Sequence, residues 1–410
     1  MTISENLENA KKLKNQAAVM SSEQKTSALI NIAAAIEDDA ESILRANNAD
    51  LQALQGIMPD IKAEKCRISA EFIAKTVDSI RQLAKLPDPV GSVISETENA
   101  EGARVSKVAV PLGVIAVVFN NPVLTFAAVA LALKSGNVLV MKTGRETYGS
   151  ARAVFTAVRK GLKKAGVSQN ISVLVEDATS KGVEEILSAT GYVDLLIPVC
   201  GKKMTEQCIA KSKVPLMCTD NGIRHIYIDE YADEEKAVDI TERFVGMKGF
   251  GYGVCIVHKN AVPEFLPRLH ARLVSARYKS AVKFRLDKHS HEVLGGWNNC
   301  VLHSEAGESD CGEAELHIKC VDGIKEAVAH ISFDSKGVSE IIVSENTDNV
   351  KFFVRAVDSA EVCVNDVSSF PADFGTDFLG ISTQKFPARG PIGLSELTSY
   401  KYVVMPNDKR

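Results

Sequence analysis

The residue of this sequence best suited to nucleophilic chemistry is Cys255, which lies in the stretch "MKGFGYGVCIVHKN". A thiol becomes a strong nucleophile only when it ionises, so a reactive cysteine needs a loop or helix terminus where its pKa can fall. The glycines before Cys255 favour such a loop. The residues after it have the texture of an apolar strand, and free cysteine is among the most buried residue types. Two interpretations stay open, a nucleophile on a loop and a thiol inside a strand.

A second group of chemically useful residues follows the first two apolar strands that the sequence predicts after residue 113. Asn120 lies in "FNNP", and Lys142, Gly144, Arg145 and Glu146 lie in "VMKTGRE". Ligands of doubly wound sheets bind at the carboxyl ends of the strands. Lys142 and Arg145 suit ribose hydroxyls or phosphate, Gly144 permits close approach of the backbone, and Glu146 begins the next helix. A solvated strand-to-helix loop is the alternative, since the G-x-G-x-x-G fingerprint of ordinary dinucleotide-binding domains is missing.

The elements that must position these residues follow from hydrophobic periodicity. The first ninety residues keep an apolar stripe at helical spacing, and "ISETENAEGARVSKVAVP" alternates like two strands around a turn. From Val114 onward, short apolar strands alternate with amphipathic helices, and a second stretch of the same kind begins at about Ala232. This order is typical of parallel sheets covered by helices on both faces, so the fold class is α/β.

Composition limits the classes of function. A chain of 410 residues with 45% hydrophobic residues is long enough for two domains, and its net charge of −4 argues against a nucleic-acid partner. No apolar run is long enough to cross a membrane, and the polar N-terminus has no signal-peptide character. Nine cysteines without a CxxC pair favour reduced thiols over disulfides or a metal site. We therefore expect a soluble cytoplasmic protein without a membrane partner.

Several segments together resemble the gamma-glutamyl phosphate reductase family of the aldehyde dehydrogenase superfamily. They are "LPDPVGSVI", "VPLGVIAVV", "LALKSGNVLVMKTGRE", "YVDLLIPVCG", "HIYIDE" and, most distinctive, "ISTQKFPARGPIGLSELTSYKY". The resemblance implies two doubly wound parallel-sheet domains and a small oligomerisation strand pair. A cofactor-binding domain is expected over residues 1–229, with a projecting hairpin at about 93–109. A catalytic domain is expected over 230–364, and residues 365–410 return to the cofactor domain and end in an oligomerisation strand.

The resemblance also implies an activity in proline biosynthesis. A thiolate attacks an acyl phosphate, phosphate leaves, and hydride from NADPH reduces the resulting thioester to an aldehyde. Cys255 follows Lys248 at the spacing seen in this family, which makes it the implied nucleophile. Asn120 matches the asparagine that helps form the oxyanion hole, and Lys142 matches the lysine that holds the adenosine ribose. The implied partners are an acyl phosphate or aldehyde, further copies of the chain in a dimer or tetramer, and a glutamate kinase.

The chain departs from the family pattern near the expected active site. "FNNPV" lacks an acid and an arginine, "FDSKGVSE" lacks two histidines, and "VSSFPADFG" lacks an arginine that would hold phosphate or carboxylate. About six residues are missing around Cys255, either after the nucleophile or together with it. Three alternatives follow: an active reductase with Cys255 on a partly exposed loop, a reductase for a less charged acyl donor, and a non-catalytic homologue with Cys255 buried in a strand.

Other residues of chemical interest receive less specific predictions. Cys200 and Cys218 lie at strand ends, where packing is the favoured role, and His225 precedes a strand, where a structural role is favoured. Asp310 and Glu313 lie near the position where the superfamily places an acid on the nicotinamide ribose.

Overall fold

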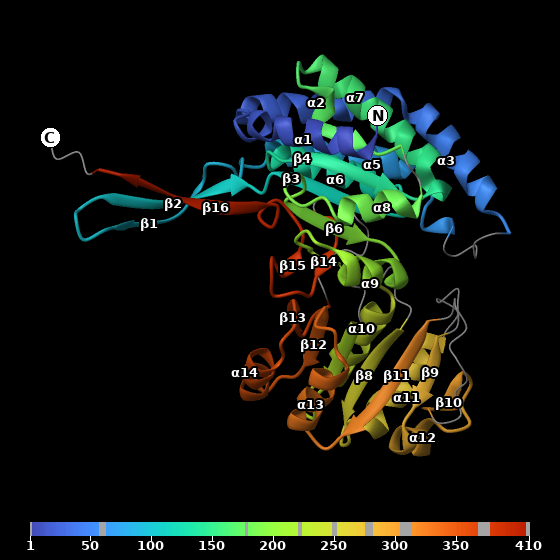
Figure 1. Cartoon of the computed structure of the whole chain (residues 1–410). Helices are drawn as coiled ribbons and strands as arrows, with labels where there is room; N and C mark the ends of the chain where they lie inside the picture. The colour runs from blue at the N-terminus through green and yellow to red at the C-terminus, as the bar shows by residue number, and fades with distance from the viewer. Residues whose placement is uncertain are drawn as a thin grey trace. The chain divides into compact units, whose positions relative to one another are not determined.

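A computed structural model of the protein describes residues 2–56, 63–176, 179–219, 224–247, 252–274, 282–303, 314–367 and 378–406. The chain divides into two compact units (Figure 1). The first unit comprises Met1–Thr219 and Phe374–Arg410, and the second unit comprises Asp220–Asp373. None of the described helices has both the length and the apolar character needed to cross a membrane.

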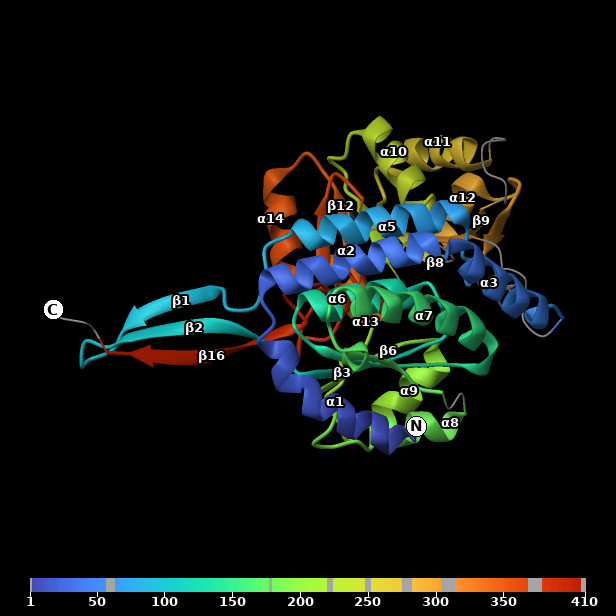
Figure 2. The ribbon, with the colours of Figure 1, turned by 90° about the horizontal axis from the view of Figure 1, so that it is seen from above.

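The N-terminal part of the first unit is helical, as the sequence predicts. Its helices are α1 (Ile3–Ala18), α2 (Ser22–Asp38), α3 (Ala40–Leu54) and α5 (Ala70–Lys85). Ser21 begins α2 with a capping box, in which its hydroxyl accepts from the Gln24 backbone and the Gln24 side chain accepts from the Ser21 backbone. Helix α2 packs against α5 and against α7 (Tyr148–Lys164), which lie beside it in Figure 2.

The described part of the first unit contains a four-stranded parallel sheet of order β5-β4-β3-β6. Its strands are β3 (Val114–Phe119), β4 (Val138–Thr143), β5 (Ser172–Leu174) and β6 (Leu195–Val199). The connecting helices are α6 (Leu124–Lys134), α7 (Tyr148–Lys164), α8 (Ser180–Leu187) and α9 (Lys202–Lys211), with short 3₁₀ turns η1 (Arg145–Thr147) and η2 (Gln169–Ile171). Every residue of β3, β4 and β6 is buried, which explains their continuous apolar sequences.

A three-stranded antiparallel sheet extends from this unit (Figure 2). Its strands are β1 (Val93–Glu98), β2 (Arg104–Pro111) and β16 (Thr398–Met405), in the order β1-β2-β16. Asn99 builds the turn of the hairpin, because its side-chain oxygen accepts from the backbone N–H groups of Glu101 and Ala103 at 3.1 and 2.8 Å. The predicted hairpin is confirmed, and the C-terminal strand joins it as a third strand.

The second unit contains a parallel sheet of order β10-β9-β11-β8-β7-β12-β13. The strands are β7 (Arg224–Ile228), β8 (Tyr252–His258), β9 (Lys283–Leu286), β10 (Cys300–Leu302), β11 (Glu315–Val321), β12 (Ser339–Val343) and β13 (Glu361–Val364). The helices are α10 (Glu234–Val245), α11 (Val262–Val274), α12 (Lys288–Leu294), α13 (Ile324–Asp334) and α14 (Thr347–Ala356). Two apolar clusters form the core of this unit.

The α/β fold class and its parallel sheets are confirmed, and both predicted boundaries of the second domain, after residues 229 and 364, are wrong. The sequence places residues 1–229 in one domain, but β7 pairs in parallel with β8 and β12 and therefore belongs to the second unit. Residues 214–218 contribute an isolated bridge from Leu216 to Leu196. Residues 365–367, which were predicted to return to the first domain, belong to the second unit, whereas the described residues from 378 onward lie in the first unit and include β14 (Ile381–Ser382) and β15 (Gly390–Pro391).

Candidate functional site

Asn120 lies at the carboxyl edge of the four-stranded sheet, where the sequence predicts a site. It follows β3 directly and is exposed. Because Phe119 pairs in register with Thr143 of β4, the residues that follow these two strands emerge at the same edge. The structure therefore brings Asn120 and the segment that begins at Gly144 to one edge of the sheet. An exposed amide at this place can donate hydrogen bonds to an anionic oxygen.

Lys142 lies beneath this edge rather than on it. Its side chain is only 2% exposed, and its ammonium donates to the Thr143 carbonyl at 3.1 Å. The neighbouring hydroxyls of Thr143 and Thr147 are 2.8 Å apart and fix the turn between β4 and α7. The ammonium of Lys142 is therefore held at the carboxyl end of β4 by the backbone of its own strand.

The next residues form the 3₁₀ turn η1, in which Arg145 and Glu146 are exposed. Gly144 has an ordinary φ of −73°, so its conformation does not require glycine. A Cβ atom at Gly144 would lie 2.5 Å from a carboxylate oxygen of Glu146, at the flexible end of that side chain. The edge therefore presents one cation and one carboxylate side by side, a set that can hold phosphate and ribose hydroxyls.

Asp50 of α3 adds a carboxylate at the start of α7. One of its oxygens accepts from both the backbone N–H and the hydroxyl of Ser150, at 2.6 Å each. A carboxylate at a helix N-terminus satisfies N–H groups that the helix leaves unpaired and interacts favourably with the helix dipole. This contact fixes the first turn of α7 below the exposed segment.

The prediction that Cys255 lies on a partly exposed loop is wrong. Cys255 is the fourth residue of β8, an inner strand of the sheet, where it pairs with Ile226 of β7 and Ile318 of β11. Its side chain is 0% exposed, and burial raises the pKa of the thiol well above its usual range. In this position the thiol stays protonated and out of reach of a substrate, which is the arrangement that the alternative of a buried strand cysteine predicts.

The amino ends of β8, β9 and β11 carry a polar cluster that the sequence analysis missed. Arg285 donates to both carboxylate oxygens of Glu315, at 2.7 and 2.8 Å, and both side chains are almost fully buried. The ring of His317 meets the ring of Tyr252 edge-to-face at 4.3 Å and that of His303 at 5.3 Å. Burial lowers the pKa of His317 to about 4 despite the nearby Glu315 carboxylate, so His317 is neutral at pH 7.

A sequence signal for this cluster existed in the strand "ELHIKCV". Glu315 and His317 stand two residues apart and therefore share one face of β11, and polar residues on a buried strand require partners. Their partner on β9, Arg285, pairs with His317 in the backbone register. Pairing between such distant segments cannot be read from one strand alone.

A second buried pair lies on β7 and β12. His225 Nδ1 is 2.9 Å from Glu340 Oε2, and both side chains are 0% exposed. The same carboxylate accepts from the His225 backbone N–H at 2.9 Å, and its other oxygen accepts from the Ser335 hydroxyl. Arg224, whose pKa is lowered by burial, faces the carboxylates of Glu361 and Glu340. The structural role predicted for His225 agrees with this complete burial.

Two arginines at the amino ends of this sheet thus face carboxylates of the same sheet. Two nitrogen atoms of the Arg285 guanidinium donate to the Glu315 carboxylate, and Arg224 faces two carboxylates. The residues Lys248, Asp310 and Glu313, which the sequence analysis singled out, lie outside the described residues. Within the described ranges, no group of three or more His, Cys, Asp or Glu side chains is arranged to hold a metal ion.

Comparisons with known proteins agree with this architecture. The model of the aldehyde dehydrogenase family matches residues 1–287. The gamma-glutamyl phosphate reductases of Streptococcus pneumoniae and Streptococcus suis are each 36% identical to the chain, over 98% and 96% of its length and 97% and 96% of their own. The crystal structure of the gamma-glutamyl phosphate reductase from Thermotoga maritima matches over the full length of both chains, with a TM-score of 0.90 and 28% identity. The chain therefore belongs to the aldehyde dehydrogenase family and, within it, to the gamma-glutamyl phosphate reductases.

Proposed function

We propose that the chain reduces gamma-glutamyl phosphate to glutamate-5-semialdehyde, the reductive step of proline biosynthesis. The observation that carries this proposal is similarity along the whole chain, since relatives 36% identical over nearly their full length have this activity in their names. The parallel sheets with their polar edges supply a scaffold that suits it.

The family implies a nicotinamide cofactor, and we propose NADPH as the form used. When bound, it would supply the hydride. Exposed Arg145 and Glu146 at the carboxyl edge of β4 fit a phosphate and ribose hydroxyls, with the ammonium of Lys142 below them. Asn120, at the end of the adjacent strand β3, is the residue we propose to donate to the oxygen that becomes anionic during the reaction.

A second candidate function, a homologue that keeps the fold without reducing an acyl phosphate, is favoured by the place of Cys255. The reaction of the family passes through a cysteine thiolate, and Cys255 is a protonated, fully buried thiol within β8. The arginines described at the amino ends of the same sheet face its own carboxylates, which weakens the case for a site that holds a dianion.

One assay separates these functions. Purified protein is given glutamate-5-semialdehyde, phosphate and NADP, and formation of NADPH is followed for the wild type and for the variants Cys255→Ala and Asn120→Ala. Wild-type turnover that requires phosphate supports the reductase. Turnover that survives Cys255→Ala assigns the nucleophile to another residue. An absence of turnover, in protein that is folded by circular dichroism, supports the non-catalytic homologue.

We also propose that the three-stranded sheet joins copies of the chain. Its outer strands β1 and β16 expose large apolar side chains, among them Val93, Ile94, Tyr400, Tyr402 and Val404. An exposed edge strand with apolar side chains is a site for pairing with another chain. The double variant Tyr402→Glu/Val404→Glu should sediment as a smaller species than the wild type, whereas Phe333→Glu, at an exposed position of α13, should not. Equal sedimentation of all three proteins would refute the proposal.

A further inference from the structure

We propose that Asn47, a buried residue of α3, is a positioning residue for the cofactor at the carboxyl edge of the four-stranded sheet. Its side-chain amide ties together the two backbone segments that carry the exposed side chains of the proposed site. One segment follows β3 and carries Asn120, and the other is η1, which carries Arg145 and Glu146. This inference rests on the proposed function, because it concerns the binding of NADPH at that edge.

Asn47 uses both ends of its amide. Its Nδ2 donates to the Cys66 carbonyl at 2.9 Å and to the Ser150 hydroxyl at 3.1 Å. Its Oδ1 accepts from the Ile68 backbone N–H at 2.8 Å. The side chain is 1% exposed, so these bonds are shielded from competing water. Replacement of Asn47 by alanine therefore leaves a carbonyl, an N–H and a hydroxyl of its neighbours with one hydrogen bond fewer.

The first branch of this network leads to Asn120. Asn47 binds the backbone at Cys66 and at Ile68 and so fixes the short connection that enters α5. The Cys66 thiol in turn donates to the Asn120 carbonyl, at 3.8 Å from sulfur to oxygen. A thiol is a weak donor, but this contact places the connection directly against the residue that we propose to bind the developing anion. The backbone of Asn120 is therefore supported from α3 through Cys66.

The second branch leads to the first turn of α7. The Ser150 hydroxyl accepts from Asn47 and donates to Asp50 Oδ2 at 2.6 Å, and the same oxygen accepts from the Ser150 backbone N–H at 2.6 Å. Gly149 lets this carboxylate come close, because a Cβ atom at Gly149 would lie 2.5 Å from Asp50 Oδ1. Ser150 is the third residue of α7, which begins directly after η1. Asn47 and Asp50 thus hold the helical turn that follows η1.

The two branches together fix the spacing of groups that must contact one ligand at the same time. Asn120, Arg145 and Glu146 are exposed, so the backbone beneath them sets where their side chains can reach. A backbone that is held in place before binding lowers the entropic cost of binding. We therefore expect loss of the Asn47 amide to weaken NADPH binding, although Asn47 itself is buried below the edge.

The opposite edge of the same sheet offers a matched control. Asn137 is also 1% exposed, and it directly precedes β4, at the amino end of the strand. Its Nδ2 donates to the Leu397 carbonyl at 2.8 Å and to the Ser135 hydroxyl at 2.7 Å, and its Oδ1 accepts from the Gly113 N–H at 2.7 Å. Asn137 thus bonds a carbonyl, a hydroxyl and an N–H as Asn47 does, and its replacement reports the effect on stability alone.

The test measures NADPH affinity and stability in the full chain. Fluorescence titration gives the dissociation constant of NADPH, and circular dichroism gives the melting temperature, for the wild type, Asn47→Ala, Ser150→Ala and Asn137→Ala. We expect about tenfold weaker binding for Asn47→Ala. The loss should be smaller for Ser150→Ala, which keeps the backbone bond to Asp50. Asn137→Ala should lower the melting temperature as Asn47→Ala does and bind NADPH as the wild type does.

The outcomes separate this inference from the proposed function. If the wild type binds NADPH and Asn47→Ala binds it equally well, the positioning role is refuted and the cofactor assignment stands. Equal weakening in Asn47→Ala and Asn137→Ala would reduce the effect to stability and would refute the positioning role as well. Should Asn47→Ala not fold, Ser150→Ala decides, since binding equal to that of the wild type would overturn the proposal. A wild type that binds no NADPH overturns the cofactor assignment and, with it, this inference.

Discussion

The burial of Cys255 makes its reactivity depend on the opening of β8. The thiol is 0% exposed between two neighbouring strands, and its pKa is raised by burial alone. Iodoacetamide should therefore label Cys255 only in urea, while the half-buried Cys320 and Cys363 are labelled in the native protein. Mass spectrometry of alkylated peptides measures both. Labelling of Cys255 in native protein as fast as that of Cys320 would show a conformation in which the thiol is accessible.

His317 predicts a dependence of stability on pH. Its pKa is about 4 in the folded protein, lowered from 6.5 mainly by burial, with Glu315, Arg285, His303 and Tyr252 around it. A group with a lowered folded pKa binds protons more strongly in the unfolded chain. The contribution of neutral His317 to the free energy of unfolding is therefore complete above pH 6.5. It is lost as the pH falls from 6.5 to 4, by up to about 3 kcal/mol.

The measurement is urea denaturation of the wild type and His317→Gln between pH 4 and pH 7.5. Between pH 6.5 and pH 4, the free energy of unfolding should fall less in His317→Gln than in the wild type. His289→Gln, at an exposed histidine, should show the same fall as the wild type. Identical slopes in the wild type and His317→Gln would refute the assignment of this pH dependence to His317.

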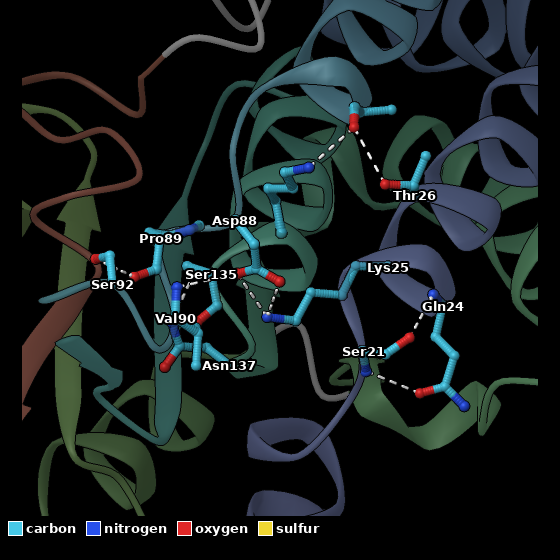
Figure 3. Close-up of polar contacts among 12 residues, drawn as sticks. Ser21, Gln24, Lys25, Thr26, Asp88, Pro89, Val90, Ser92, Ser135 and Asn137 are labelled. Atoms are coloured by element: carbon cyan, nitrogen blue, oxygen red, sulfur yellow. Dashed lines mark hydrogen bonds and ion pairs between the residues drawn. The ribbon is translucent and has the colours of Figure 1, made fainter. Parts of the chain in front are cut away.

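At the scale of elements, a buried ion pair joins α2 to the segment that enters β1. The ammonium of Lys25 is 0% exposed and contacts both carboxylate oxygens of Asp88 at 2.9 Å (Figure 3). The same carboxylate accepts from the backbone of Val90 at 3.0 Å, and the buried ammonium of Lys134 in α6 donates to the Ala84 carbonyl at 2.9 Å. These bonds join α2 to the segment that enters β1, and α6 to the last turn of α5, where the three-stranded sheet leaves the unit.

Removal of one partner of this ion pair should lower the free energy of unfolding more than replacement of both partners. Asp88→Asn leaves the Lys25 ammonium buried without its carboxylate and should lower the free energy of unfolding by roughly 3–5 kcal/mol. Lys25→Met/Asp88→Asn removes the unpaired charge and should recover part of that loss. Urea denaturation of the wild type, both single variants and the double variant gives the coupling energy of the pair. If the losses of stability in the two single variants add up to the loss in the double variant, the pair contributes no coupling energy.

The elements that depend on local sequence could be predicted, and those that depend on distant pairing could not. The continuous apolar runs of β3 and β4 are local signals, and the structure confirms them. β7 has the same apolar texture as the strands of the first sheet, so only its pairing with β8 and β12 shows where it belongs. Asn120 was predicted at its observed edge because parallel strands end together.

The position of Cys255 illustrates the same limit within the site. Its glycine-rich approach favours a loop, but the strand that it enters begins at Tyr252, before the cysteine. The contact between Arg285 and Glu315 joins residues thirty positions apart. Neither of these follows from the spacing of residue types alone.

At the scale of the whole molecule, each unit has an apolar core of its own, and we predict that the cores respond separately to core substitutions. Phe126 of α6 lies in the core of the first unit, and Phe353 of α14 lies in that of the second, where its ring stacks on Tyr227 with centroids 6.3 Å apart. Both are fully buried. Replacement of either by alanine should lower the stability of its own unit by about 3–5 kcal/mol.

Calorimetry of the full chain tests this separation, because units with separate cores unfold as distinct cooperative transitions. Phe126→Ala should lower the melting temperature of one transition and Phe353→Ala that of the other, and each variant should leave the remaining transition in place. Hydrogen exchange read by mass spectrometry assigns each transition to residues, since faster exchange should appear in α6 and β3 for the first variant and in α14 and β12 for the second. A single transition that both substitutions shift equally would mean that the two cores stabilise one cooperative structure.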